Sequence, residues 1–166
     1  MAYALENLYK IIGSLTPLPV DCGQLCQAKC CQEWQEGVGV YLVPGERELL
    51  AGQDWARIQE TEQAEGLLLC TGSCKRNQRP LLCRLFPLAA RFNIKDELEV
   101  VLDEDGLLIC PLVQAGDLSL LNPQFIQAVK KVWQELSQTA WGKHYLESYS
   151  QRLEQQKNDF WKKLFE

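Results

Sequence analysis

Apolar side chains recur at helical spacing near the start of this chain. Within residues 2–15 they stand at Leu5, Leu8, Ile11, Ile12 and Leu15. This spacing predicts an amphipathic helix that packs one face onto a domain. The two prolines in residues 16–19 are expected to end it.

The C-terminal residues show the same helical spacing. Asn122 followed by Pro123 is typical of a helix start, because asparagine caps free N–H groups and proline suits the first turn. Apolar positions then continue to Leu136. A second helix is predicted from about Trp141 to Phe165.

Short apolar runs between turn residues predict strands in the middle of the chain. Residues 66–69 are apolar and lead directly into Cys70. Residues 88–94 and 97–102 are expected to form a hairpin. The other predicted strands are residues 37–43 and 107–109, short helices are predicted at residues 46–51 and 80–86, and residues 54–65 fit either a strand or a helix.

Composition and charge restrict the partners and the compartment. The chain has 166 residues and a formal net charge of -5, which argues against nucleic acid as a partner. No stretch approaches the roughly 18 apolar residues of a membrane span, so no membrane partner is expected. Residues 1–10 lack a basic region followed by an apolar run, so we expect no signal peptide and a cytoplasmic protein.

The chain contains eight cysteines, at Cys22, Cys26, Cys30, Cys31, Cys70, Cys74, Cys83 and Cys110. Cytoplasmic thiols mostly stay reduced, which favours metal binding over disulfides or scattered buried thiols. Eight thiols match two four-thiolate sites, and zinc and iron–sulfur clusters both use four thiolates. We therefore expect all eight to be metal ligands, with an iron–sulfur cluster of the 4Fe-4S type as the cofactor and zinc as the alternative.

The spacing of the first cysteines restricts how they bind. In a continuous helix Cys22 and Cys30 would stand about 12 Å apart along the axis. Two sulfurs on one tetrahedral zinc are only about 3.8 Å apart, given bonds near 2.3 Å. Either this segment is not one helix, or its thiols serve different metals. The adjacent pair Cys30 and Cys31 favours two sites, because neighbouring side chains diverge.

Several other residues are candidates for a role near the metal. Arg79 and Arg84 flank Cys83 and are expected to bind the cofactor, because cations offset the charge of a thiolate site. The alternative interpretation is that both arginines are solvated charges on the surface. Cys110 follows a predicted apolar strand, so the alternative to metal binding is that its side chain packs in the hydrophobic core. Glu46 fits the charge at a helix start, with a metal-linked role as the other interpretation.

Four separated motifs occur here in the order found in a known family. They are the cluster ending in Cys30-Cys31, then Pro44-Gly45-Glu46, Cys70-x3-Cys74, and Arg79-Pro80-x2-Cys83-Arg84-x-Phe86-Pro87. Through them, residues 20–112 resemble the YkgJ-type cysteine-cluster family, described as a zinc- or iron-chelating domain. The resemblance also implies a distant similarity to the flagellin lysine-N-methylase group, which is linked to an iron–sulfur cluster and S-adenosylmethionine.

These observations together predict an α+β fold. Its centre is a small cysteine-rich metal-binding core with short antiparallel strands, flanked by an N-terminal helix and a C-terminal helical segment. Residues 1–121 are expected to form the cysteine-cluster domain with the N-terminal helix. Residues 122–166 are expected to form a helical extension that packs on the same domain.

Three functions remain open at this point. The first is a metal-binding protein for electron transfer, redox sensing or a cluster-dependent reaction, with another protein as its partner. The second is an S-adenosylmethionine-dependent protein-modifying enzyme, with a pocket beside the metal lined by the C-terminal helices. The third is a structural zinc module that presents those helices to a protein. With one histidine, His144, expected at the surface or in helix packing, no Ser/His/Asp or Cys/His catalytic set is visible.

Overall fold

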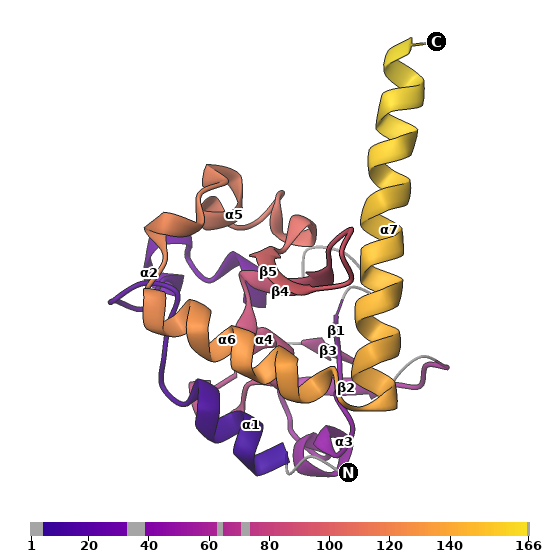
Figure 1. Cartoon of the computed structure of the whole chain (residues 1–166). Helices are drawn as coiled ribbons and strands as arrows, with labels where there is room; N and C mark the ends of the chain where they lie inside the picture. Colours follow the sequence, from indigo (N-terminus) through magenta and orange to yellow (C-terminus); the bar gives the residue numbers. More distant parts are fainter. Residues whose placement is uncertain (1–4, 33–38, 63–64, 71–73, 166) are drawn as a thin grey trace.

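The computed structural model describes residues 5–32, 39–62, 65–70 and 74–165. Helix α6 (Pro123–Leu136) crosses the middle of the molecule. Helix α1 (Leu5–Ile12) packs along one side of α6, and the first strand of a hairpin packs against the other (Figure 1). Asn122 caps α6, since its Oδ1 accepts a hydrogen bond of 2.9 Å from the N–H of Gln124. The predicted start of this helix is therefore confirmed.

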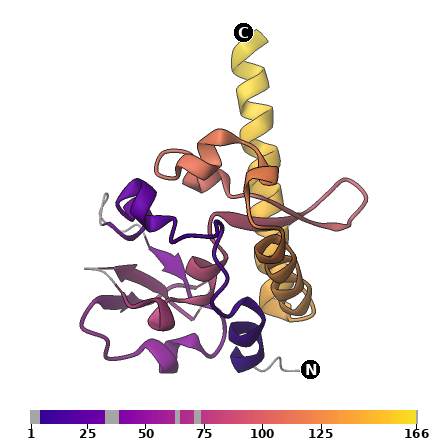
Figure 2. The ribbon, with the colours of Figure 1, turned by 90° about the vertical axis from the view of Figure 1, so that its left-hand side faces the viewer.

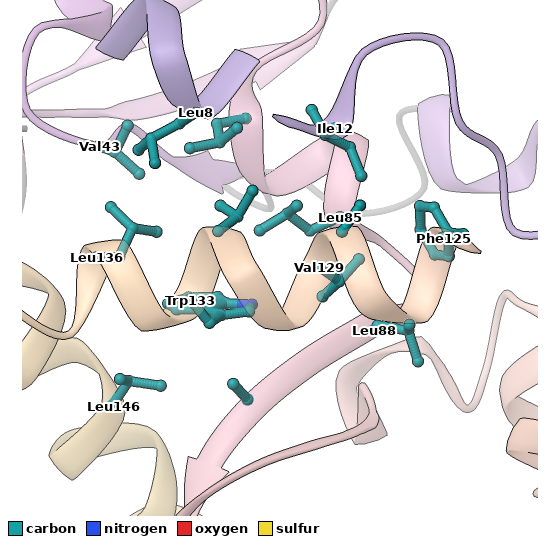
Figure 3. Close-up of a cluster of buried hydrophobic side chains, with 14 of the residues drawn as sticks. Leu8, Ile12, Val43, Leu85, Leu88, Phe125, Val129, Trp133, Leu136 and Leu146 are labelled. Atoms are coloured by element: carbon teal, nitrogen blue, oxygen red, sulfur yellow. The ribbon is translucent and has the colours of Figure 1, made fainter. Parts of the chain in front are cut away.

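The main hydrophobic core surrounds α6. Figure 3 shows Leu8 and Ile12 of α1 on one side of the helix and Leu146 on the other. Trp133 and Phe125 are almost completely buried between these layers. Burial of apolar side chains on both faces of α6 is the main source of its stability.

A three-stranded antiparallel sheet forms a second layer. Strand β3 (Leu67–Cys70) is central, between β1 (Val40–Tyr41) and β2 (Ala56–Gln59). Helix α3 (Glu46–Leu50) follows β1, and Gly45 before it has a positive φ of 89°. A small core of Leu42, Leu50, Trp55 and Leu68 packs around these elements.

The predicted hairpin is confirmed as strands β4 (Leu88–Phe92) and β5 (Leu98–Leu102). Figure 2 shows it extending from the molecule on the side away from the three-stranded sheet. Helix α4 (Leu81–Leu85) immediately precedes it. The predicted strand at residues 66–69 is also confirmed, and it delivers Cys70 as expected. The α+β class with short antiparallel strands is confirmed.

Other strand predictions need correction. Residues 107–109 form turns, because the N–H groups of Ile109 and Cys110 both bond to the carbonyl of Gly106. Cys110 thus ends no strand and instead precedes helix α5 (Pro111–Ala115). The strand predicted at residues 37–43 is reduced to β1, and residues 37–38 lie outside the described part. In the described part of residues 54–65, which leaves out 63–64, the strand covers residues 56–59.

Helix α7 (Ala140–Phe165) begins on the body and projects well beyond it (Figure 1). Gly142 lies so close to the end of α6 that a Cβ there would be 2.0 Å from the carbonyl oxygen of Leu136. Leu146, Tyr149 and Leu153 are buried, whereas Phe160 is 60% exposed. No helix that the structure describes is long and apolar enough to cross a lipid bilayer.

Candidate metal centre

The first cysteine segment turns back on itself. Helix α2 (Gly23–Cys26) has Cys22 at its N-cap, and the thiol of Cys26 lies 3.7 Å from the carbonyl oxygen of Cys22. Gln27 and Ala28 then adopt positive φ values of 54° and 51°. Two successive left-handed residues other than glycine are strained, at about 1–3 kcal/mol each. The reversal shows that residues 22–31 are not a continuous helix. This was the first of the two alternatives that the cysteine spacing left open.

Five cysteines line one open cavity beside this turn. They are Cys22, Cys26, Cys30, Cys31 and Cys110, which come from segments nearly eighty residues apart in the chain. Cys110 is 7% exposed at the N-cap of α5. Phe86, Ile109 and Leu112 supply apolar parts of the wall. The residues that line this cavity come from neither α6 nor α7.

The other three cysteines gather on the sheet side. Cys70 ends β3, and both it and Cys74 pack against the small core around Leu68 and Trp55. Burial, together with the charges of Cys74 and Cys31, raises the pKa of Cys70 to about 11. Cys83, on α4, has a pKa well above its ordinary value, first through burial and then through the charges of Cys70, Cys31 and Cys74.

Cys30 and Cys31 connect the two groups. Their sulfur atoms are 3.9 Å apart. A hydrogen bond from Cys30 lowers the pKa of Cys31, against the effect of burial, and the nearby guanidinium of Arg79 lowers it further. The same hydrogen bond raises the pKa of Cys30. Cys31 is therefore the thiol in this pair that carries negative charge most readily.

The two arginines singled out in the sequence lie in different surroundings. Arg79 lines the cavity, and although burial opposes its charge, the neighbouring Cys31 and Cys74 raise its pKa. Its Nε is buried and has no hydrogen-bond partner among the described residues. The guanidinium of Arg84 instead stacks 4.3 Å from the ring centre of Tyr9 and donates to the carbonyls of Arg79 and Asn77. The role of Arg84 in binding a cofactor stays a prediction. The same role for Arg79 also stays a prediction, but the position of Arg79 at the cavity favours it.

Glu46 occupies a more central position than the sequence indicated. It is at the start of α3, as expected, yet it is completely buried. Its carboxylate accepts hydrogen bonds from the hydroxyl of Tyr9, the N–H of Val43 at 2.9 Å and the N–H of Leu81 at 2.6 Å. Sequence reasoning missed Tyr9 entirely, and its position in the α1 apolar pattern gave no signal of a polar partner. His144, by contrast, is exposed on α7, as one of its two interpretations predicted.

The eight cysteines are suitable metal ligands by their chemistry, but their sulfur atoms are not yet placed around a common ion. All eight cysteines have free thiols, and thiolates are ligands for both zinc and iron–sulfur clusters. Across the described residues, no three His, Cys, Asp or Glu side chains are placed so that they would hold one ion together. Binding of one ion by three or more of these thiols therefore requires them to draw closer.

Comparison of the chain with family models, curated proteins and solved structures finds no match. The similarity to the YkgJ-type family, read from the order of four motifs, accordingly stays a prediction.

Proposed function

We propose that this chain is a cytoplasmic cysteine-cluster protein of the YkgJ type that binds an iron–sulfur cluster, with zinc as the alternative metal. In this proposal it serves as a redox or electron-transfer protein, or as an accessory to a cluster-dependent reaction. Its expected partner is another protein rather than nucleic acid or a membrane. All eight cysteines are the proposed ligands.

One observation carries the proposal more than any other. Cys22, Cys26, Cys30 and Cys31 share a cavity wall with Cys110, although Cys110 is far away in sequence. Of these five thiols only Cys110 is buried, and thiols that merely filled space in a core would not collect around a cavity. The unpaired Nε of Arg79 at the same cavity supports the presence of negative charge there.

A cluster bound here would supply reversible uptake of one electron. The chain's own residues would hold it and set its surroundings. Arg79 would offset part of the negative charge of the thiolates, and the apolar side chains of Phe86 and Leu112 would limit the access of water. The cation would make reduction easier, whereas exclusion of water would make it harder, because reduction adds negative charge that water would otherwise stabilise.

The deciding experiment is purification without oxygen, followed by analysis of iron, zinc and acid-labile sulfide. We expect brown protein with iron and sulfide in similar amounts. A colourless protein with stoichiometric zinc would show that the bound metal is zinc and not an iron–sulfur cluster. Protein that holds neither metal when reduced and supplied with both would contradict metal binding altogether.

A structural zinc module is the second candidate, and the end of α7 favours it. Phe160, Trp161 and Leu164 are exposed beyond the body of the molecule, next to Lys162 and Lys163. Trp133, by contrast, is buried, so a protein-binding surface made of all the C-terminal tryptophans is not formed. This candidate predicts tight zinc binding, no sulfide, and loss of partner binding when Phe160 and Leu164 are replaced by serine.

The enzyme alternative predicted a pocket beside the metal lined by the C-terminal helices. The cavity at the cysteines is lined instead by residues of α2 and the turn after it, of α5, and of the segments on either side of α4. No observation therefore favours this alternative. Calorimetry of the metal-loaded protein with S-adenosylmethionine tests it directly, and we expect no binding.

A further inference from the structure

Helix α7 contacts a short segment that leads directly to Cys110. This segment, Asp103-Glu-Asp-Gly106, follows β5 and contains one turn of 3-10 helix, and we call it the acidic turn. We propose that Arg152 and Tyr149 of α7 are positioning residues for Cys110: they fix the acidic turn, and the turn fixes Cys110 at the cavity wall. The proposal rests on the metal-binding function proposed above, because it makes α7 control one of the proposed ligands.

Two side chains of α7 bind the two aspartates of the acidic turn. The guanidinium of Arg152 donates to both carboxylate oxygens of Asp105, at 2.7 Å each. The hydroxyl of Tyr149 donates to Oδ1 of Asp103 at 3.0 Å, and the guanidinium of Arg152 lies 5.1 Å from the ring centre of Tyr149. A bidentate pair fixes the orientation of its carboxylate as well as its distance. The acidic turn is therefore attached to α7 at two points.

The acidic turn fixes the backbone of Cys110 in its turn. The N–H of Gly106 donates to the carbonyl of Asp103, and the N–H of Cys110 donates to the carbonyl of Gly106, both at 2.8 Å. Gly106 is packed so tightly that a Cβ there would be 2.9 Å from both Phe86 and Val113. Phe86 lines the cavity, and Val113 is on α5, which begins directly after Cys110. A shift of the acidic turn is therefore transmitted to Cys110.

The part of α7 that carries these contacts is itself fixed to the body. Tyr149 and Leu153 are buried and pack with Ala89 of β4. Arg152 thus extends from an anchored stretch of α7, which precedes the exposed end of the helix. A ligand that is already held in place loses less freedom when it binds, so a fixed Cys110 is expected to strengthen metal binding.

Labelling of individual thiols in the reduced, metal-free full chain tests the proposal. Pulses of iodoacetamide followed by peptide mass spectrometry give a rate for each cysteine. Cys110 is only 7% exposed, so its rate reports how often this wall of the cavity opens. Arg152→Met, which keeps the apolar stem of the side chain, and Tyr149→Phe should each speed labelling of Cys110 at least about fivefold. Labelling of Cys83, on α4, should not change.

Two further comparisons separate positioning from general loss of stability. Arg91→Met is the matched control, because the ion pair of Arg91 with Glu99 is similarly exposed but joins β4 to β5, and labelling of Cys110 should stay unchanged. Arg152→Glu should speed labelling of Cys110 more than Arg152→Met does. The double variant Arg152→Glu/Asp105→Arg should restore the slow rate, because it remakes the ion pair with the charges exchanged.

Three results would overturn the proposal. They are an unchanged rate at Cys110 in Arg152→Met, an equal acceleration at Cys83, and failure of the double variant to restore the slow rate. With the metal-loaded protein, Arg152→Met should also release its metal to a chelator faster than Arg91→Met. If the unaltered chain binds no metal, the proposed function fails, whereas the labelling of the metal-free chain still decides the role of α7. The two failures are therefore distinguishable.

Discussion

The carboxylate of Glu46, on α3, accepts a hydrogen bond of 2.6 Å from the N–H of Leu81, the first residue of α4. A buried side chain of α3 thus caps the start of α4, which begins 35 residues later and carries Cys83. The hydroxyl of Tyr9 on α1 bonds to the same oxygen. Helices α1, α3 and α4 are therefore held together by one acidic side chain.

Replacing Glu46 by glutamine should destabilise the fold. The amide presents N–H groups where the carboxylate accepts bonds from the N–H groups of Leu81 and Val43, which leaves a buried donor unpaired. We expect the free energy of unfolding to fall by about 1–3 kcal/mol in urea denaturation. Glu48→Gln, on the exposed side of the same helix, is the matched control and should change little. Equal effects of both variants would mean that Glu46 does not join these elements.

Asp103 should make stability depend on pH in an unusual direction. Burial, together with the charge of Asp105, raises the pKa of Asp103 above its ordinary 3.8, although the hydroxyl of Tyr149 donates to it. A carboxyl group with a raised folded pKa stabilises the fold most at low pH and loses that contribution as pH rises through the folded pKa. The stability of the unaltered chain relative to Asp103→Asn should therefore increase as pH falls from 7 towards 4.

Urea denaturation of both proteins in the same metal state measures this difference. Asp117 offers a control of opposite sign, because the hydroxyl and N–H of Ser119 lower its pKa. The stability of the unaltered chain relative to Asp117→Asn should instead decrease as pH falls through 3.8 towards the lowered folded pKa, so the denaturation series is continued below pH 4. If the stability of the unaltered chain relative to Asp103→Asn also decreased as pH fell, folding would not raise the pKa of the Asp103 carboxyl group.

Two leucines on α7 should differ sharply in their contribution to stability. Leu146 is completely buried beside α6, whereas Leu164 is 56% exposed on the projecting end. Replacing Leu146 by alanine should cost about 2–5 kcal/mol, because it leaves a cavity in the core. Leu164→Ala should change the free energy of unfolding by less than about 0.5 kcal/mol. Thermal and urea denaturation check both, and a large loss for Leu164→Ala would mean that the helix end is covered.

Cys31 should be the first thiol to react in reduced, metal-free protein. Its pKa is lowered by the hydrogen bond from Cys30 and by Arg79, and the thiolate is the reactive form. At pH 7 iodoacetamide should modify Cys31 more than about tenfold faster than Cys70, whose pKa is about 11. Peptide mass spectrometry over time gives both rates.

The variant Cys30→Ala tests the cause of this reactivity. It removes the hydrogen-bond donor, so labelling of Cys31 should slow. Lys29→Met changes an exposed charge next to the pair and should have little effect. Labelling of Cys31 that is unaffected by Cys30→Ala would assign its reactivity to Arg79 alone.

Much of the secondary structure was available from local sequence signals. The cap and apolar spacing of α6, the apolar spacing of α7, the prolines around α4 and the apolar run of β3 act over a few residues, so the chain specifies them nearly independently of its surroundings. The strand expected at residues 107–109 was wrong for the same reason. Its apolar residues fit a strand, but the carbonyl of Gly106 accepts two N–H groups and closes a turn that periodicity does not reveal.

The sequence by itself determined the chemistry of this protein: eight thiols, their order, and the helices and strands that carry several of them. Tertiary structure decided which thiols meet. The left-handed turn at Gln27 and Ala28, the approach of Cys110 to the first segment, and the choice of Arg79 over Arg84 as the cation at the cavity all depend on contacts between distant parts of the chain. Spacing along a sequence limits how far apart two side chains can be, but only packing brings them to the same place.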